Sequence, residues 1–435
     1  MTDGLPELGL QEAAAEFCAG FELNPSSPDV SVVRRAFFDT IAVAAAGSTE
    51  PSMSALRENV DVVEGPCLIY GTDHHADLLT AVRLNAAAAS VLDLDDTSDE
   101  LRGHPSAVMI PVIDAATQLI GAEPLEQCEA YVVGYRVQRV LARAVDIDLH
   151  RSQRWNTAST IARLGAVAAL SKLYGFTAEE MMRAFTVAGW TPGTKLHTHE
   201  AIPAQTAIAA TNAVQAVQLA AAGFGGGEAL VPPVPAIWAP REQTASAAFA
   251  ALRSEQPIML NIKKYPTCSN LHAAIECLAS SELPAASDIA SIEICVEPGG
   301  TGPLLDHLPA TVSEARFSME YVVAGAILDG RVGLDSFSLD KLREPARQAL
   351  MQTICVREAP VPETGPGDYD GHFTTIRTTT GDGRTVSLRN DTWAGHAGTP
   401  LNLDGLNQKI RWCREWTASH GGSAHHLTEE GHLAS

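Results

Sequence analysis

Apolar residues recur every three or four positions through most of the first 222 residues, and short polar or glycine-containing turns separate the runs. This spacing predicts helices that bury one face, many of them rich in alanine. The predicted helices span 9–22, 29–45, 76–92, 107–122, 125–145, 159–174, 177–189 and 206–222. No strand pattern longer than a few residues interrupts them, so this part of the chain is expected to be all-helical.

The pattern changes near residue 257. Residues 289–296 alternate between apolar and polar side chains, which indicates a half-buried strand. Residues 374–380 and 384–388 flank Gly381-Asp382-Gly383, a sequence typical of a β-hairpin turn. Helical patterns return at 271–278, 317–328 and 401–413. Strands that alternate with helices predict an α+β domain.

The predicted fold class is therefore mainly α with an α+β second domain. The expected helical domain covers residues 1–260 and is completed by 396–420, while the α+β lid domain covers 261–395. Residues 421–435 are polar and are expected to form a disordered tail.

Composition narrows the class of protein. A net charge of -22 argues against nucleic acid and against an anionic membrane as partners. The eight cysteines form no C-x-x-C motif, so they are expected to be reduced thiols. The N-terminus does not resemble a signal peptide, and no apolar run reaches membrane-spanning length. A soluble cytoplasmic enzyme is the expectation.

The main candidate chemistry lies between the predicted helices 76–92 and 107–122. Asp93, Asp95, Asp96 and Thr97 end the first helix, and His104 precedes the second. Asp and Thr often cap helices, so helix termination explains any one of these residues. The combined motif also supplies carboxylates, a hydroxyl and an imidazole within one loop, which are the groups needed for general acid/base catalysis.

This D-x-D-D-T, six residues, H-P-S arrangement resembles the MmgE/PrpD family, which includes 2-methylcitrate dehydratase, cis-aconitate decarboxylase and iminodisuccinate epimerase. The loop is about one residue longer than is usual in the family. The resemblance implies a helical domain with an α+β lid, a homodimer, no cofactor and a small carboxylate substrate. An acidic cluster could instead bind a divalent cation, but the resemblance argues against a metal.

Two further motifs resemble the family. In Lys263-Lys-Tyr-Pro-Thr-Cys268-Ser-Asn-Leu-His272, the resemblance implies that Lys263 meets a substrate carboxylate and that Cys268 and His272 lie at the site. Without the resemblance, an exposed lysine pair and an inert cysteine account for this stretch. In Ala-Arg316-Phe-Ser318-Met-Glu-Tyr321, the resemblance implies that Tyr321 donates a proton.

The residue types of this second motif are also compatible with structural roles. A buried core tyrosine is the alternative for Tyr321. Arg316 and Ser318 fit either a carboxylate clamp or a network at the start of a helix.

Two positions depart from the family pattern. Asn156 stands where the family has a histidine, and an amide forms hydrogen bonds but does not exchange protons at neutral pH. Residues 202–207 lack the expected lysine, and Lys195 is the nearest candidate, roughly two helical turns too early. Both departures suggest a pocket less positive than one built for a tricarboxylate.

The predicted function is that of a lyase, a dehydratase or decarboxylase that abstracts a proton alpha to a carboxylate or carbonyl. Asp93 and His104 are the predicted acid/base pair, Lys263 the carboxylate anchor and Tyr321 the proton donor. Thr97, Asn156, Lys195, Cys268, His272, Arg316 and Ser318 are the predicted substrate-binding residues. An isomerase or epimerase and a catalytically inactive binding relative are the alternatives.

Overall fold

A computed structural model describes residues 10–144, 150, 153–191, 193–225, 250, 252–254, 256–362 and 371–427. The chain divides into two compact units. The first comprises Met1–Val91, Asp95–Asn261 and Asn402–Ser435, and the second comprises Leu92–Leu94 and Ile262–Leu401. Among the described helices, none is long and apolar enough to cross a membrane.

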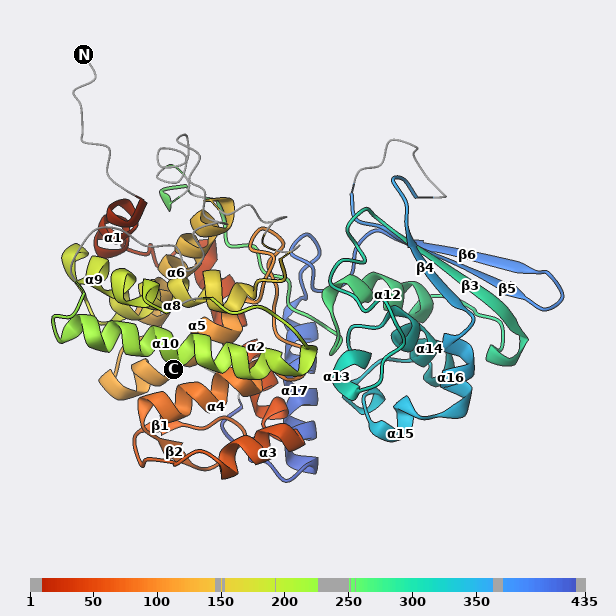
Figure 1. The fold of residues 1–435 in the computed structure, drawn as a ribbon, viewed down its shortest axis with the longest axis horizontal. Coiled ribbons are helices and arrows are strands. Elements are labelled where there is room, and N and C mark those ends of the chain that lie inside the picture. Colours follow the sequence, from red (N-terminus) through yellow and green to blue (C-terminus); the bar gives the residue numbers. More distant parts are fainter. Residues whose placement is uncertain are drawn as a thin grey trace, which may run out of the picture. The chain divides into compact units, whose positions relative to one another are not determined.

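The first unit is a helical assembly with one short hairpin (Figure 1). Its elements are α1 (Leu10–Gly20), α2 (Pro28–Gly47), α3 (Pro51–Glu58), β1 (Cys67–Leu68), β2 (His75–Ala76), α4 (Leu78–Ser90), α5 (Pro105–Ile120), α6 (Pro124–Ala144), the π-helical turn η1 (Ala158–Ala162), α8 (Arg163–Leu173), α9 (Ala178–Gly189), the 3-10 turn η2 (His199–Ala201), α10 (Ile202–Ala221) and α17 (Leu403–Ser419).

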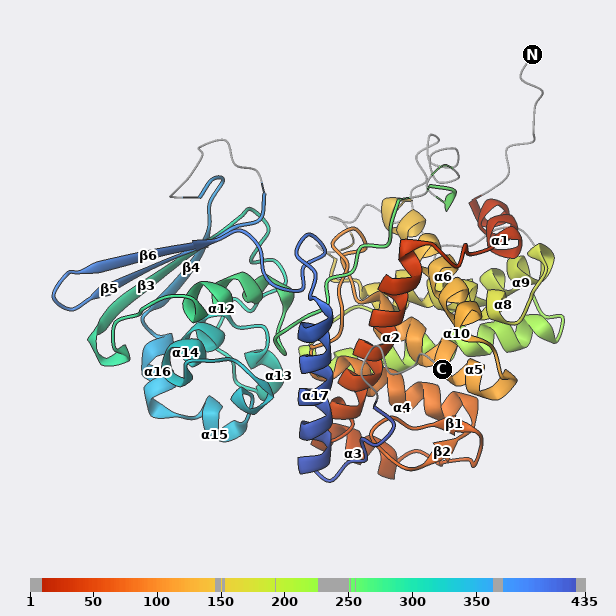
Figure 2. The same cartoon turned by 180° about the vertical axis from the view of Figure 1, so that it is seen from behind.

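Small residues let the helices of this unit approach closely. A Cβ atom at Gly134 of α6 would lie 2.6 Å from the carbonyl oxygen of Gly165 in α8, so the two backbones meet where only glycine fits. The C-terminal helix α17 runs along α2 (Figure 2). Lys409 of α17 lies 2.5 Å from Oδ1 of Asp39 in α2, and both side chains are buried. This ion pair ties the end of the chain to the helical unit.

The second unit contains a four-stranded sheet with helices on one face (Figure 1). The strand order is β4-β3-β5-β6, with β3 and β4 parallel and the other pairs antiparallel. Its elements are η3 (Ser269–Leu271), α12 (His272–Ala279), η4 (Ala286–Asp288), β3 (Ile289–Val296), α13 (Val312–Ala315), α14 (Met319–Asp329), η5 (Leu334–Ser336), α15 (Leu339–Leu342), α16 (Pro345–Met351), β4 (Ile354–Glu358), β5 (Thr374–Thr380) and β6 (Thr385–Asn390).

The predicted fold class is confirmed: a large helical unit is joined to a smaller one with a mixed sheet. The structure adds elements that the sequence analysis missed, among them α3, the β1–β2 hairpin, the short helices α13, α15 and α16, and β4. The last helix also continues to Ser419. A disordered tail was expected over residues 421–435, of which 428–435 lie outside the described residues. In the described part of this segment, the Ser423 N–H donates to the carbonyl of Gly71 at 2.8 Å.

Candidate active site

Asp93 and Lys263 form a buried ion pair in the second unit. Lys263 Nζ lies 2.8 Å from Asp93 Oδ1 and 2.9 Å from the Asp93 carbonyl oxygen. Lys263 is 0% exposed and Asp93 6%. The second carboxylate oxygen, Oδ2, has no hydrogen-bond partner among the described residues. Lys263 therefore binds one carboxylate oxygen of Asp93 and leaves the other without a hydrogen bond from the described residues.

The backbone around Asp93 is strained and held in place. Asp93 has φ 49°, in the left-handed region that residues other than glycine rarely adopt. The Arg316 guanidinium donates to the carbonyl oxygens of Leu92 at 3.1 Å and of Pro266 at 3.0 Å. Arg316, predicted as a carboxylate clamp or part of a helix-start network, here anchors the segment that carries Asp93.

His104 and Asp95 form a second pair, in the first unit. His104 Nδ1 lies 2.9 Å from Asp95 Oδ2. The Asp95 side chain is 1% exposed and that of His104 is 37% exposed. The Asp95 carboxylate accepts a hydrogen bond from Nδ1–H, which fixes the tautomer and leaves the lone pair of the imidazole on Nε2. His104 also occupies the N-cap position of α5. This arrangement is suited to proton transfer by an accessible imidazole.

The residues after Asp95 fasten the loop to the helical unit. Asp96, at 0% exposure, accepts hydrogen bonds from the backbone and hydroxyl of Ser106, and the Ser106 hydroxyl lies 2.7 Å from that of Tyr131. Burial raises the pKa of Asp96 to about 7, although its hydrogen bonds from Ser106 oppose the shift. Thr97 and Asn261 exchange both backbone hydrogen bonds, at 3.0 and 2.7 Å. Thr97 therefore positions the loop through its backbone.

Asn156 lies in a network beside the His104 loop. Its side-chain amide donates to Gln205 Oε1, and the Gln205 amide donates to the carbonyl of Lys195 at 2.8 Å. A Cβ atom at Gly103 would lie 2.6 Å from Thr157 Oγ1, so the turn after Asn156 contacts the residue before His104. The structure thus brings two predicted residues, Asn156 and Lys195, into one network.

Lys195 reaches this network although its position in the sequence is too early for the family pattern. It forms an isolated bridge with Trp155, and its Nζ lies 5.1 Å from the centroid of the Trp155 ring. Gln205 falls in the stretch where the family lysine is expected, and the carbonyl of Lys195 lies directly beside it. Lys195 itself lies in an irregular segment, residues 193–198.

Cys268 and His272 lie together at the start of α12, in the second unit. The Cys268 N–H donates to the Arg316 carbonyl at 3.0 Å, and its side chain is buried. The His272 ring is 0% exposed and packs edge-on against Tyr265, at 5.2 Å, and Trp393, at 4.5 Å. These contacts place both residues inside the unit, and Cys268 lies next to the Arg316 anchor.

Ser318 and Tyr321 make local contacts at the start of α14. Ser318 is the N-cap and accepts the Tyr321 N–H at 3.2 Å. The Tyr321 hydroxyl donates to the carbonyl of Ser336 at 2.5 Å, and the residue is 1% exposed. Burial raises the pKa of Tyr321 to about 12. Donation of this proton to a substrate, as predicted, would require the hydroxyl to exchange its present partner.

Several non-glycine residues in the candidate loops have positive φ angles, and the residue types alone did not predict this. Among the described residues, the non-glycine positions with positive φ are Asp93, Arg102 and Arg154. Two of them lie in the Asp93–His104 loop, and the third lies two residues before Asn156. Such strain gathers at functional sites because the surrounding structure must hold it in place. Asp93, Asp95 and His104 are also of the types that bind divalent cations, so a metal site remains the alternative use of this loop.

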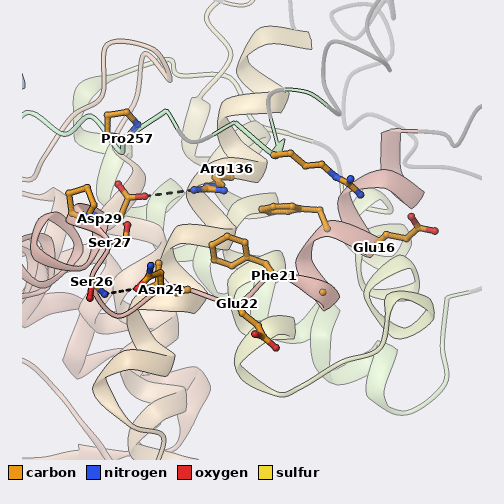
Figure 3. A pocket seen from close by; sticks show the side chains of 14 residues that line it. Glu16, Phe21, Glu22, Asn24, Ser26, Ser27, Asp29, Arg136 and Pro257 are labelled. Atoms are coloured by element: carbon orange, nitrogen blue, oxygen red, sulfur yellow. Dashed lines mark hydrogen bonds and ion pairs between the residues drawn. The ribbon is translucent and has the colours of Figure 1, made fainter.

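An open pocket of about 800 Å³ lies elsewhere in the first unit, and none of the predicted site residues lines it (Figure 3). The Arg136 guanidinium there lies 4.9 Å from the centroid of the Phe21 ring and 3.8 Å from Asp29 Oδ2. The Ile258 N–H donates to Asp29 Oδ1 at 3.0 Å. These charged groups partner one another and join α1, α2 and α6, which indicates a structural role.

Comparison with known proteins assigns both halves of the chain to the same family. The sequence profile of the MmgE/PrpD N-terminal domain matches residues 12–233, and that of the MmgE/PrpD C-terminal domain matches residues 265–430. Human cis-aconitate decarboxylase is 25% identical over 349 residues, covering 76% of this chain and 71% of that protein. Mouse cis-aconitate decarboxylase is 24% identical over 360 residues, covering 76% of this chain and 70% of that protein.

Proposed function

The chain belongs to the MmgE/PrpD family, and from that premise we propose that it is a lyase that needs no cofactor. The substrate would be a small carboxylic acid, and the reaction a dehydration or decarboxylation through an intermediate that is negatively charged alpha to a carboxylate or carbonyl. The two relatives named cis-aconitate decarboxylase support this class of reaction. The observation that carries the proposal is the buried Asp93–Lys263 pair.

The two ion pairs supply complementary groups to one loop. Asp93 and Asp95 are separated by a single residue, so covalent geometry keeps their Cα atoms within about 7 Å. Lys263 stabilises the carboxylate of Asp93, and Asp95 orients the imidazole of His104. The loop therefore offers a carboxylate held by Lys263 and an accessible imidazole, and imidazole is the side chain that most often acts in general acid/base catalysis.

In dehydration, His104 Nε2 would take the proton alpha to the activating carboxylate or carbonyl. The electron pair of that C–H bond would form the new double bond as the hydroxyl group on the next carbon leaves. That hydroxyl would depart as water after accepting the abstracted proton from the His104 imidazolium, which returns the ring to its neutral form. In decarboxylation, His104 would begin in its protonated form, and the electron pair left by the departing CO2 would accept the proton of that imidazolium. Asp95 would stabilise that imidazolium in both reactions.

A second candidate function is isomerisation or epimerisation of a related dicarboxylate or imino acid. Asn156 favours it, because an amide replaces the imidazole that the family pattern has at this position. Losing one proton-exchanging group changes which proton can be moved, whereas the His104–Asp95 pair is retained.

Deuterium uptake from heavy water distinguishes these functions. Wild-type protein is incubated with cis-aconitate, citrate and a panel of other di- and tricarboxylates, and products are followed by NMR. A product that has lost water or CO2 supports the lyase. Exchange without net loss supports the isomerase or epimerase, and no change with any acid would favour a binding protein.

His104→Ala tests the proposed base directly. We expect turnover to fall by at least about 100-fold, with a Tm close to that of wild type, because the imidazole is partly exposed. His74→Ala, at an exposed histidine, is the matched control and should retain full activity. Full activity in His104→Ala would remove His104 from the mechanism.

The homodimer expected from the family remains part of this proposal. Sedimentation velocity tests it, since the chain has a mass of 46.0 kDa. A single species at that mass across the micromolar range would contradict the dimer.

A further inference from the structure

Three arginines are among the largest fully buried side chains, and one of them has no carboxylate partner in the part of the chain that the structure describes. Arg139 binds both oxygens of Glu100, at 2.8 to 3.0 Å. Arg347 lies 2.7 Å from Asp329. Arg163, at 1% exposure, donates one hydrogen bond, from Nη2 to the carbonyl of Thr191 at 2.8 Å. Among the described residues, its Nε has no hydrogen-bond partner and no carboxylate forms an ion pair with the guanidinium.

A buried guanidinium in this state is costly. Burial alone lowers the pKa of Arg163 to about 10, with no acidic group acting in the opposite direction. The Thr191 carbonyl follows the end of α9, where the helix dipole provides only a partial negative charge. Burying a charge without a full counter-charge normally destabilises a protein. Arg163 therefore retains unused capacity for a planar anion, which guanidinium groups bind with two parallel hydrogen bonds.

The surroundings of Arg163 connect it with the candidate site. Arg163 is the first residue of α8, directly after the π-helical turn η1. That turn begins two residues after Asn156, and Thr160 within it donates its hydroxyl to the carbonyl of Asn156 at 2.9 Å. π-Helical turns frequently occur at functional sites, because the extra residue redirects the side chains that follow.

His150 contacts the same turn and has an unsatisfied acceptor. Its Nε2 lies 2.9 Å from Thr160 Oγ1. Because the Thr160 hydroxyl already donates to Asn156, the imidazole must donate from Nε2–H. Its Nδ1 is then a bare acceptor, buried and without a partner among the described residues. Burial lowers the pKa of His150 to about 4, so the ring is neutral at pH 7.

We propose that the guanidinium of Arg163 binds a carboxylate of the substrate. This inference rests on the proposed function and assigns a residue to a second carboxylate of its substrate. One carboxylate would activate the C–H bond near the catalytic loop, and another would bind Arg163. The family pattern has a histidine where this chain has Asn156, and a lysine in the stretch that contains Gln205. Arg163 would replace the positive charge that these two differences remove.

Two measurements on Arg163→Met and Arg163→Lys test the assignment. Isothermal titration calorimetry uses tricarballylate, a saturated tricarboxylate, as the probe. We expect Arg163→Met to bind it at least about tenfold more weakly than wild type, and Arg163→Lys to lose less. Urea denaturation without carboxylate should give Arg163→Met a midpoint equal to or above that of wild type, because an unpaired buried charge has been removed. Arg83→Met, at an exposed arginine, is the control.

Several outcomes would overturn the assignment. Unchanged affinity in Arg163→Met, or no tricarballylate binding by wild type, contradicts it. Failure of Arg163→Met to fold, or a lower urea midpoint with unchanged affinity, would make Arg163 a structural cap of α9.

The test is separable from that of the proposed function. If wild type catalyses exchange with a dicarboxylate and Arg163→Met has the same KM, the inference fails while the function stands. If wild type shows Arg163-dependent binding without any exchange, the subsite stands while the proposed function fails.

Discussion

Lys263 Nζ lies 2.8 Å from Asp93 Oδ1, and the two residues are 170 positions apart in the sequence. A buried pair of this kind adds little net stability, because desolvation offsets much of the attraction between the charges. Removing one partner is different, since the remaining charge is then buried alone. The strained segment at Asp93 therefore depends on two distant side chains, Lys263 through this pair and Arg316 through its hydrogen bond to the Leu92 carbonyl.

Lys263→Met should destabilise the protein by about 3–5 kcal/mol, because it leaves the carboxylate of Asp93 buried without its cation. Adding Asp93→Asn should recover part of this loss, and asparagine tolerates the left-handed backbone found there. Urea denaturation of both single variants and the double variant measures the coupling. The control, Lys264→Met, removes an exposed pair with Glu276 and should cost at most about 1 kcal/mol. Additive single effects would contradict a coupled pair.

Asp95→Asn should reduce kcat by about 10²–10⁴-fold with little loss of stability. An amide at this position can donate to Nδ1, which would favour the wrong tautomer of His104. Steady-state kinetics on the acid that wild type turns over measures the loss, and Asp61→Asn, at an exposed position, is the control. Retention of kcat would show that the imidazole does not depend on this carboxylate.

Asp96 should make stability fall as pH rises from about 4 to about 7. Its pKa in the folded protein is about 7, above the ordinary value of 3.8. Between these values the unfolded chain has released the proton and the folded chain has kept it, so raising the pH favours unfolding. Asp96→Asn removes this dependence, and its stability relative to wild type should improve across the window. Urea midpoints at pH 4.5, 6 and 7.5 measure the trend, and parallel curves would contradict it.

Tyr321→Phe separates a structural tyrosine from a catalytic one. The hydroxyl donates to the buried Ser336 carbonyl, so its loss should destabilise the protein by about 1–2 kcal/mol. We expect kcat to change by less than about tenfold, because this hydroxyl already has a partner within its own unit. A loss above about 100-fold with unchanged stability would support the proton donor implied by the family.

The strongest sequence patterns predicted the fold well. The alternating strand 289–296 and the hairpin strand 374–380 have the predicted bounds. Strand β4 was missed because its five residues alternate only weakly and are half-buried or exposed. The π-helical turn has no residue signature, since it depends on how α8 packs against its neighbours.

The residue types of the candidate site could be predicted, but their pairing could not. Asp93 and His104 were expected to act as a pair, whereas the structure pairs His104 with Asp95 and Asp93 with Lys263. Spacing along a chain does not reveal which of two adjacent carboxylates faces which partner. The buried guanidinium of Arg163 was overlooked because an arginine in a helix is usually solvated.

The assignment of Leu92–Leu94 to the second unit limits how this protein can be divided. The backbone passes from one unit to the other four times, so no single cut separates them. Excising residues 262–401 would remove the unit with which these three residues pack, and would leave Leu92 and Leu94, both 0% exposed, without their surroundings. A chimaera that exchanges this unit with a homologue must therefore also exchange the three residues.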